Sequence, residues 1–273
     1  MTIKIRPDWL QDVPETLLLP LYNRAVETVR TDAIIHDPRA VALVEQLDYD
    51  FTQFGSGHVA HAIRARVFDA WVRAFLAHQP DAVVVNLGAG LDTQFERVDN
   101  GHVQWYELDV PESIALWKRF FTETERHRTL AYSALDPAWI ELIPNDRPVL
   151  FQAAGLLMYF TEAQVRQLIS RLATRFADGF VQFDTISRWF SARSVAGKAA
   201  ISKAYTLPAM PWGINVREMA TLATWHPAIE VVAIQDYVRG YRHRWGAYGY
   251  AVLLPPIYSR TMGAMVQLRF RPA

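Results

Sequence analysis

Residues 83–93, VVVNLGAGLDT, place two glycines directly after a short apolar block. A buried strand that ends in Gly-x-Gly lets the backbone approach a ligand where a side chain would clash, although a tight turn that binds nothing has the same pattern. A second apolar block, residues 103–108, is followed by Asp109, about twenty residues after Gly88. At this spacing an acid reaches ribose hydroxyls in nucleotide-binding α/β folds, so the two segments together predict a nucleoside site.

The residues around the glycines separate two kinds of nucleoside. A dinucleotide fold uses a third glycine and binds a pyrophosphate at a helix N-terminus. Here Thr93 stands at the third-glycine position and Asp92 precedes it. An acidic side chain there would repel a pyrophosphate, whereas S-adenosylmethionine has no phosphate and carries a cationic sulfonium. The turn therefore favours a methyl donor over NAD.

The blocks that must position these residues alternate with helical segments. Short apolar blocks stand at residues 82–86, 103–108, 129–132, 149–153 and 180–183, and segments of helical composition at 112–124, 137–142 and 161–177. This alternation predicts a parallel sheet wound by right-handed crossovers. We expect one α/β domain over residues 1–273, made of a helical cover (1–80), a cofactor-binding core (81–186), a mostly helical cap insertion (187–228) and closing strands (229–273).

Composition excludes several classes of protein. The 28 basic and 28 acidic side chains cancel, which argues against a nucleic-acid partner. The chain has no cysteine, hence no disulfide framework and no thiolate nucleophile. No apolar stretch approaches the ~20 residues of a membrane span, and the first fifteen residues lack the apolar region of a signal peptide. We therefore expect a cytoplasmic protein without a membrane partner.

Several segments, in the same order, resemble the leucine carboxyl methyltransferase family, in its bacterial branch similar to polyketide O-methyltransferases of the tetracenomycin type. The matching segments are residues 16–25 (TLLLPLYNRA), 37–38 (DP), 65–67 (ARV), 86–93 (NLGAGLDT), 106–111 (YELDVP) and 155–159 (GLLMY). The resemblance implies a class I, Rossmann-like methyltransferase. Its expected fold is a seven-stranded, mostly parallel sheet with an N-terminal helical cover and a helical insertion, and its expected cofactor is S-adenosylmethionine.

The resemblance also implies cofactor contacts. Arg66 matches the arginine that pairs with the methionine carboxylate, a contact that suits the bidentate guanidinium fork, and Arg24 is a second basic contact. The expected floor beneath the cofactor is Gly88, Ala89 and Gly90. The expected acid that accepts hydrogen bonds from both ribose hydroxyls is Asp109. A competing role for Asp109 is to cap the following helix.

Two positions depart from the family pattern. Ser133 and Ala134 stand where many members have an acid beside the adenine, so Ser133 or its backbone takes that place. Ala154 stands where many members have a glutamate near the methionine amino group. Backbone carbonyls of Ala153 and Ala154 remain as acceptors for that ammonium.

The implied reaction is O-methylation of a hydroxyl or carboxyl group on a small molecule. A carboxylate acceptor needs no base, whereas a phenol benefits from one, and His243 is the candidate among eight histidines. No histidine has metal-ligand spacing, so no metal is predicted. Aromatic and sulfur side chains in the cap insertion suit a flat acceptor or simple packing: Trp189, Tyr205, Met210, Trp212 and Trp225. Three arginines, Arg239, Arg242 and Arg244, suit an acidic acceptor or a solvated rim.

Two other functions stay open at this point. The eukaryotic branch of the family methylates a protein C-terminus, although nothing in the sequence indicates a protein-docking surface. The absence of a glutamate at Ala154 also leaves room for a non-catalytic nucleotide-binding module. The sequence does not specify the oligomeric state.

Overall fold

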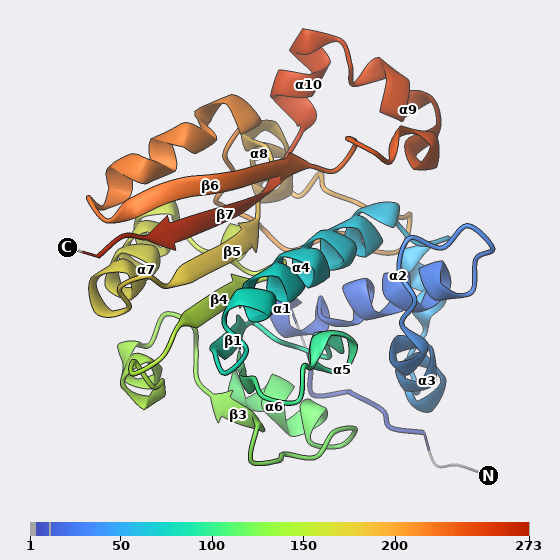
Figure 1. The fold of residues 1–273 in the computed structure, drawn as a ribbon. Coiled ribbons are helices and arrows are strands. Elements are labelled where there is room, and N and C mark those ends of the chain that lie inside the picture. The colour runs from blue at the N-terminus through green and yellow to red at the C-terminus, as the bar shows by residue number, and fades with distance from the viewer. Residues whose placement is uncertain (1–3, 11, 273) are drawn as a thin grey trace.

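Seven strands form one sheet in the computed structural model, which describes residues 4–10 and 12–272 (Figure 1). The strands are β1 (Val83–Leu87), β2 (Gln104–Asp109), β3 (His127–Ala131), β4 (Val149–Ala153), β5 (Phe180–Asp184), β6 (Ile229–Asp236) and β7 (Ala264–Phe270). Their order across the sheet is β3-β2-β1-β4-β5-β7-β6. Strands β1 to β5 pair in parallel, and β7 is antiparallel to both of its neighbours. The predicted seven-stranded, mostly parallel α/β sheet is confirmed.

The central strands are buried on both faces, which explains their continuous apolar composition. Every residue of β1 and β4 is buried. Strand β1 lies between β2 and β4. From β1 the chain adds β2 and β3 on one side of the sheet and then β4 and β5 on the other side, so the strand order reverses at β1. In open α/β sheets such a reversal opens a crevice at the carboxyl ends of the strands, which is where ligands bind.

Helices cover both faces of the sheet. The helical segments are α1 (Asp12–Glu15), α2 (Leu18–Thr28), α3 (Pro38–Gln46), η1 (Phe51–Phe54), α4 (Val59–His78), α5 (Gln94–Val98), α6 (Pro111–Trp117), η2 (Pro137–Leu142), η3 (Leu157–Tyr159), α7 (Glu162–Arg175), α8 (Arg188–Val195), η4 (Val216–Trp225), η5 (Arg242–Trp245), α9 (Gly246–Ala251) and α10 (Pro255–Thr261). Helix α4 packs on the face that presents Val84, and α7 packs on the opposite face with Val83 and Val85. Within the described ranges, no helix is both long and apolar enough to cross a membrane.

The expected helical cover is present at residues 12–78. Asp37 caps α3, because its Oδ1 accepts a hydrogen bond from the backbone N–H of Ala40 at 2.9 Å, and Pro38 occupies the first turn. A capping box starts α7, with Thr161 and Gln164 bonded reciprocally.

The cap insertion differs from the prediction. Only α8 and η4 are helical in residues 187–228, and residues 196–215 between them contain no helix. Pro208 and Pro211 lack the N–H that a helix needs. Gly213 packs so closely that an added Cβ would lie 2.7 Å from the carbonyl oxygen of Ser187. The expectation of a mostly helical insertion is therefore wrong.

Candidate functional site

A cavity of about 1200 Å³ opens where β1 to β5 end, at the predicted crevice. Segments that follow these strands form its floor, and α2, α4 and residues 186–210 form much of its wall. Residues 237–263, between β6 and β7, complete the wall with Tyr237, Trp245, Tyr248, Thr261, Met262 and Gly263. Segments that are far apart in the sequence, between Val13 and Gly263, therefore meet around one cavity.

The Gly-x-Gly turn forms part of the cavity floor, as predicted. Gly88 and Gly90 have φ values of +66° and +53°, a conformation that favours glycine. A Cβ on Gly88 would lie 2.8 Å from Leu156 Cδ1, and one on Gly90 would lie 2.8 Å from Leu17 Cβ. Ala89 between them also lines the cavity. The turn therefore presents bare backbone to whatever binds there.

Asp109 stands at the end of β2 beside this turn. Its Oδ2 accepts from the backbone N–H of Gly90 at 2.8 Å, and its Oδ1 accepts from Val110 N–H at 2.7 Å. Each carboxylate oxygen offers two acceptor positions, so one remains on each for a further donor. The competing capping role is not observed, because Val110 is the N-cap of α6 and that helix has no side-chain cap. Asp109 thus has the geometry to accept from a pair of vicinal hydroxyls.

The arginine of α4 that reaches the cavity is Arg64 rather than the predicted Arg66. Arg64 is buried, lines the cavity and donates from Nη1 to Asp184 Oδ2 at 2.9 Å. Burial acts to lower the pKa of Arg64, but the neighbouring Asp184 outweighs it and the pKa is raised, so the guanidinium stays charged. Arg66 is exposed and does not line the cavity. Of these two arginines, Arg64 is therefore the one whose side chain lies at the cavity.

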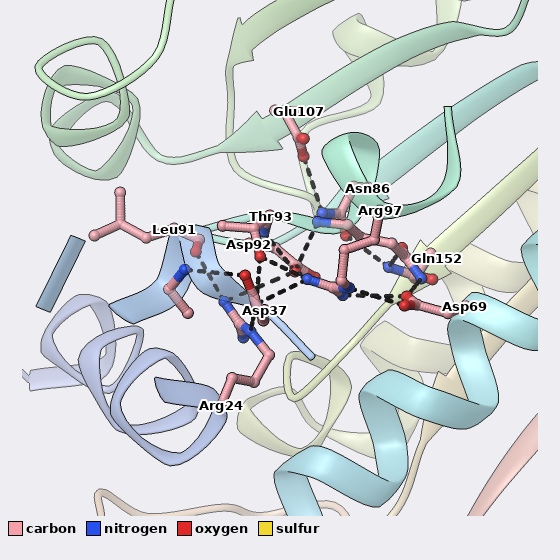
Figure 2. Close-up of polar contacts among 12 residues, drawn as sticks. Arg24, Asp37, Asp69, Asn86, Leu91, Asp92, Thr93, Arg97, Glu107 and Gln152 are labelled. Atoms are coloured by element: carbon pink, nitrogen blue, oxygen red, sulfur yellow. Dashed lines mark hydrogen bonds and ion pairs between the residues drawn. The ribbon is translucent and has the colours of Figure 1, made fainter. Parts of the chain in front are cut away.

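Arg24 lies at the cavity, and two of its five N–H donors bond to protein groups (Figure 2). Its Nε donates to Asp37 Oδ2 at 2.9 Å, and its Nη2 donates to the carbonyl of Leu91 at 3.0 Å. The same Nη2 lies 3.8 Å from Asp92 Oδ1. Arg24 therefore holds the loop that follows the glycine turn, and the direct cofactor contact expected of it stays a prediction.

Arg24 belongs to a buried network of charges beneath the loop (Figure 2). Arg97 of α5 grips Asp69 of α4 with two bonds, Nε to Oδ2 at 2.8 Å and Nη2 to Oδ1 at 3.1 Å. Its Nη1 also donates to Asp37 Oδ2 at 3.0 Å. Although burial acts to raise the pKa of Asp37, Arg24 and Arg97 hold it below its ordinary value. The network ties α2, α3, α4 and α5 to one loop.

The remaining residues predicted to contact the cofactor border the cavity. Ser133 and Ala134 follow β3, and Ala154 follows β4. An acid next to this departure is Asp184, at the end of β5, which bonds to the neighbouring Gly155 and was not predicted from the sequence. Asp184 Oδ1 accepts from the backbone N–H of Gly155 at 2.5 Å, and its Oδ2 accepts from the Tyr237 hydroxyl at 3.0 Å as well as from Arg64. Its place at the carboxyl end of a predicted strand was the available signal.

The histidines that border the cavity are His58 and His61, whereas the candidate His243 is exposed and does not line it. Asn23 orients this pair: its Oδ1 accepts from the backbone N–H of His58 at 2.9 Å, so its Nδ2 donates to His61 Nδ1, 2.6 Å away. The Nδ1 of His58 accepts from Ala60 N–H at 3.3 Å. In both neutral rings the proton therefore sits on Nε2.

Electrostatics keep these two rings neutral. Burial lowers the pKa of His58, and burial together with the charge of Arg64 places the pKa of His61 well below its ordinary value. Neutral rings with Nδ1 already accepting present N–H donors rather than bases. Within the described residues, no group of three or more potential ligands could hold a metal ion.

The side chains expected around an acceptor divide into two groups. Trp189 and Met210 line the cavity, whereas Tyr205, Trp212 and Trp225 do not and instead pack in hydrophobic clusters. Of the three arginines, Arg239 and Arg242 are exposed. Arg244 is not part of a solvated rim, and its guanidinium is already paired inside the protein. It forms a buried pair with Glu27, Nη1 to Oε1 at 2.9 Å and Nη2 to Oε2 at 2.7 Å.

A sheet in this strand order, with a glycine turn after β1 and an acid at the end of β2 beside it, defines a class I S-adenosylmethionine-dependent methyltransferase. Comparison of the sequence with family models narrows this class. The chain belongs to the leucine carboxyl methyltransferase family, whose model matches residues 18–173.

Individual relatives agree with this assignment. The chain is 35% identical over 184 residues to the tetracenomycin polyketide synthesis O-methyltransferase TcmP of Streptomyces glaucescens, which covers 66% of this chain and 68% of that protein. It is 27% identical over 262 residues to the S-adenosyl-L-methionine-dependent methyltransferase dpfgK of Gibberella zeae, over 86% of this chain and 82% of that protein. The solved structure of the plantazolicin methyltransferase BamL superposes with a TM-score of 0.52 at 8% identity, over 96% of this chain and all of that one. At that identity the likeness shows the fold alone.

Proposed function

We propose that this methyltransferase transfers the methyl group to a hydroxyl or carboxyl oxygen of a small, polyketide-like or aromatic molecule. The observation that carries the proposal is that one cavity joins the glycine turn and Asp109 to an apolar region lined by Trp189, Phe190 and Met210. Ligand pockets of this kind combine apolar walls with a few placed polar groups. The relatives support the proposal, since TcmP is named as a polyketide O-methyltransferase.

The residues of the floor fit S-adenosylmethionine. Asp109 retains one acceptor position on each oxygen for the ribose hydroxyls, and the backbone of Gly88 and Gly90 admits close approach. The Arg64 guanidinium suits the methionine carboxylate, because a buried charged fork binds a carboxylate strongly. When bound, the cofactor supplies an electrophilic methyl group on its sulfonium.

The polar groups of the wall bear on the acceptor oxygen. His58 and His61 are donors in their neutral forms, so they can orient an oxygen without removing its proton. In-line methyl transfer needs alignment and a nucleophilic oxygen. This arrangement favours an acceptor that is already ionised at neutral pH, such as a carboxylate, over a neutral phenol.

Thermal unfolding tests the cofactor assignment. A ligand at about 100-fold its dissociation constant stabilises the folded state by about 2.7 kcal/mol. For a chain of this size we expect saturating S-adenosylhomocysteine to raise Tm by roughly 5–10 °C, and NAD to leave it unchanged. A shift with NAD and none with S-adenosylmethionine or S-adenosylhomocysteine would contradict the proposal. Incubation of S-adenosylmethionine with aromatic hydroxy acids, followed by mass spectrometry of the products, then tests the acceptor class.

Cofactor binding should also depend on pH through Asp109. Burial raises the pKa of Asp109, although hydrogen bonds from the Gly90 and Val110 N–H groups oppose this effect. A raised pKa means that the carboxylate gains its proton at a higher pH than an ordinary aspartate, which titrates near ~3.9. As the pH falls, the affinity for S-adenosylhomocysteine should therefore begin to fall above that ordinary value. Calorimetric titrations between neutral and mildly acidic pH check this.

The matched variant for this experiment is Asp109→Asn. It should bind more weakly at neutral pH and lose the pH dependence in that range. If the variant and the parent protein show the same slope with pH, another group is responsible.

A further inference from the structure

Helix α2 buries three polar side chains, and each one contacts a different wall of the cavity. Asn23, Arg24 and Glu27 are all buried, and Asn23 and Arg24 bond to α4 and to the loop after β1, respectively. Buried polar groups lose water and must regain partners, so a helix that carries three of them on its inner side is tied to its surroundings at specific points.

One end of this connection lies at the cofactor floor. Arg24 donates to the carbonyl of Leu91, directly after the glycine turn. Leu17, just before α2, packs so closely that a Cβ on Gly90 would lie 2.8 Å from its own Cβ. A ligand held against this turn therefore rests on atoms that contact α2.

The other end lies at residues 237–263, which we call the C-terminal wall. Glu27 holds Arg244 with two hydrogen bonds of 2.9 and 2.7 Å, and only 5% and 6% of these two side chains are exposed. A bidentate pair of this kind fixes orientation as well as distance. It joins two segments 217 residues apart in the sequence.

The C-terminal wall contacts α8 through α10, α2 through Arg244 and the start of α4 through Trp245. In Figure 1 the part that carries α9 and α10 lies at the edge of the molecule, beyond the sheet. Tyr250, Leu253 and Leu254 are exposed on it. On its inner side, Trp245 contacts the ring of His58 edge-on, with ring centroids 5.2 Å apart. Because this segment lines the cavity, its movement would change access to the cavity.

We propose that α2 couples cofactor binding to the placement of the C-terminal wall, with Glu27 and Arg244 as the positioning residues. The inference rests on the proposed function, because it takes S-adenosylmethionine as the ligand of the floor. A ligand between Gly88 and Asp109 stabilises the loop that Arg24 holds, and the loop stabilises α2. Glu27 on the next turn of α2 then holds Arg244, so the wall closes around an acceptor after the cofactor has bound.

Hydrogen exchange measured by mass spectrometry, with S-adenosylhomocysteine as the probe, tests the coupling. In the parent protein the probe should slow exchange in peptides from residues 237–263 by about fivefold or more, the lower end of ordinary coupling between sites. In Glu27→Gln the probe should bind with affinity close to that of the parent protein, measured by calorimetry, but leave exchange in these peptides nearly unchanged. The matched control is Glu230→Gln, which removes the exposed pair with Arg271 and should behave like the parent protein.

The outcomes distinguish the coupling from the function. Equal protection of residues 237–263 in Glu27→Gln and in the parent protein would overturn the coupling, and so would bound probe without protection in the parent protein. Failure of the parent protein to bind the probe at all would overturn the proposed function itself, and the coupling with it. If Glu27→Gln does not fold, Arg244→Lys keeps one charged donor and should retain part of the protection; full protection in it would count against the bidentate tether.

Discussion

Replacement of Arg64 by methionine should weaken the binding of S-adenosylhomocysteine about a hundredfold, whereas Arg66→Met should leave it unchanged. A hydrogen bond to a charged group contributes about 1.5–3 kcal/mol, and 2.7 kcal/mol corresponds to a hundredfold change in Kd. Arg64 is buried at the cavity and Arg66 is exposed on the same helix, so the pair forms a matched comparison. Isothermal titration calorimetry measures both constants.

A shortened ligand separates the proposed contact from a general effect on the fold. 5′-Methylthioadenosine lacks the amino-acid part of the cofactor, so Arg64→Met should bind it nearly as well as the parent protein does. Arg64→Lys keeps a charge beside Asp184 but loses the planar fork, and should bind S-adenosylhomocysteine with intermediate affinity. Equal losses for both ligands would indicate that Arg64 supports the fold rather than the carboxylate. A loss of affinity confined to Arg66→Met would instead support Arg66 as the contact of the methionine carboxylate, as the resemblance implies.

The floor of the site was predictable because its residues follow two strands, β1 and β2, that are consecutive in the sequence and adjacent in the sheet. The turn at Gly88 and Gly90 follows β1, and Asp109 ends β2, which pairs with β1 in parallel from Val83↔Gln104 to Leu87↔Leu108. Parallel neighbours bring their carboxyl ends to the same edge of the sheet. The spacing in the sequence therefore predicted that Asp109 and the glycine turn lie close together, and in the structure they are joined by a hydrogen bond of 2.8 Å.

The resemblance pointed to Arg66, which is exposed, because it specified a segment and not a helix face. Two residues apart in an α-helix means about 200° of rotation, so Arg64 and Arg66 point in nearly opposite directions. The apolar positions of α4 contained the missing information: Val67 and Phe68, three and four residues after Arg64, are buried. Applying the helical period to these positions would have placed Arg64 inside.

The wall of the cavity depends on contacts that the sequence does not indicate. His61 and Asn23 are 38 residues apart, and Glu27 and Arg244 are 217 residues apart. Nothing in the composition near His243 shows that this side chain faces solvent while its neighbour Arg244 turns inward. Such choices follow from how the segment between β6 and β7 packs on α2, which is a tertiary property. Residues 196–215 of the cap insertion were expected to be mostly helical because of their composition, although Pro208 and Pro211 disfavour a helix there.

Arg97→Met should cause the largest loss of stability among these substitutions, about 3–5 kcal/mol, because it removes one partner from a buried charge network. Arg97 donates to Asp69 through two nitrogens and to Asp37 through a third. Arg24 and Arg97 now face three carboxylates, those of Asp37, Asp69 and Asp92. Without Arg97, Arg24 alone would remain beside Asp37 and Asp92, and Asp69 would keep as a charged partner only the half-exposed Arg73, 4.0 Å away. For a chain of this length the loss corresponds to a fall in Tm of roughly 10 °C, measured by calorimetry.

The matched control is Arg126→Met, which removes an exposed arginine that grips Asp99 with bonds of 2.6 and 3.0 Å. Exposed pairs contribute about 0–1 kcal/mol, so its Tm should change by no more than a few degrees. The two losses should also differ in their pH dependence. The pKa of Asp37 is held below its ordinary value in the folded protein, so its contribution is present at neutral pH and is lost as the pH falls through that lowered pKa. The deficit of Arg97→Met relative to the parent protein should therefore shrink in acid, since burial without Arg97 favours the protonated carboxyl. Two outcomes would contradict this prediction: a similar fall in Tm for the two variants, or a stability deficit of Arg97→Met that does not depend on pH. Either would mean that the network stabilises the loop after the glycine turn by packing rather than by charge pairing.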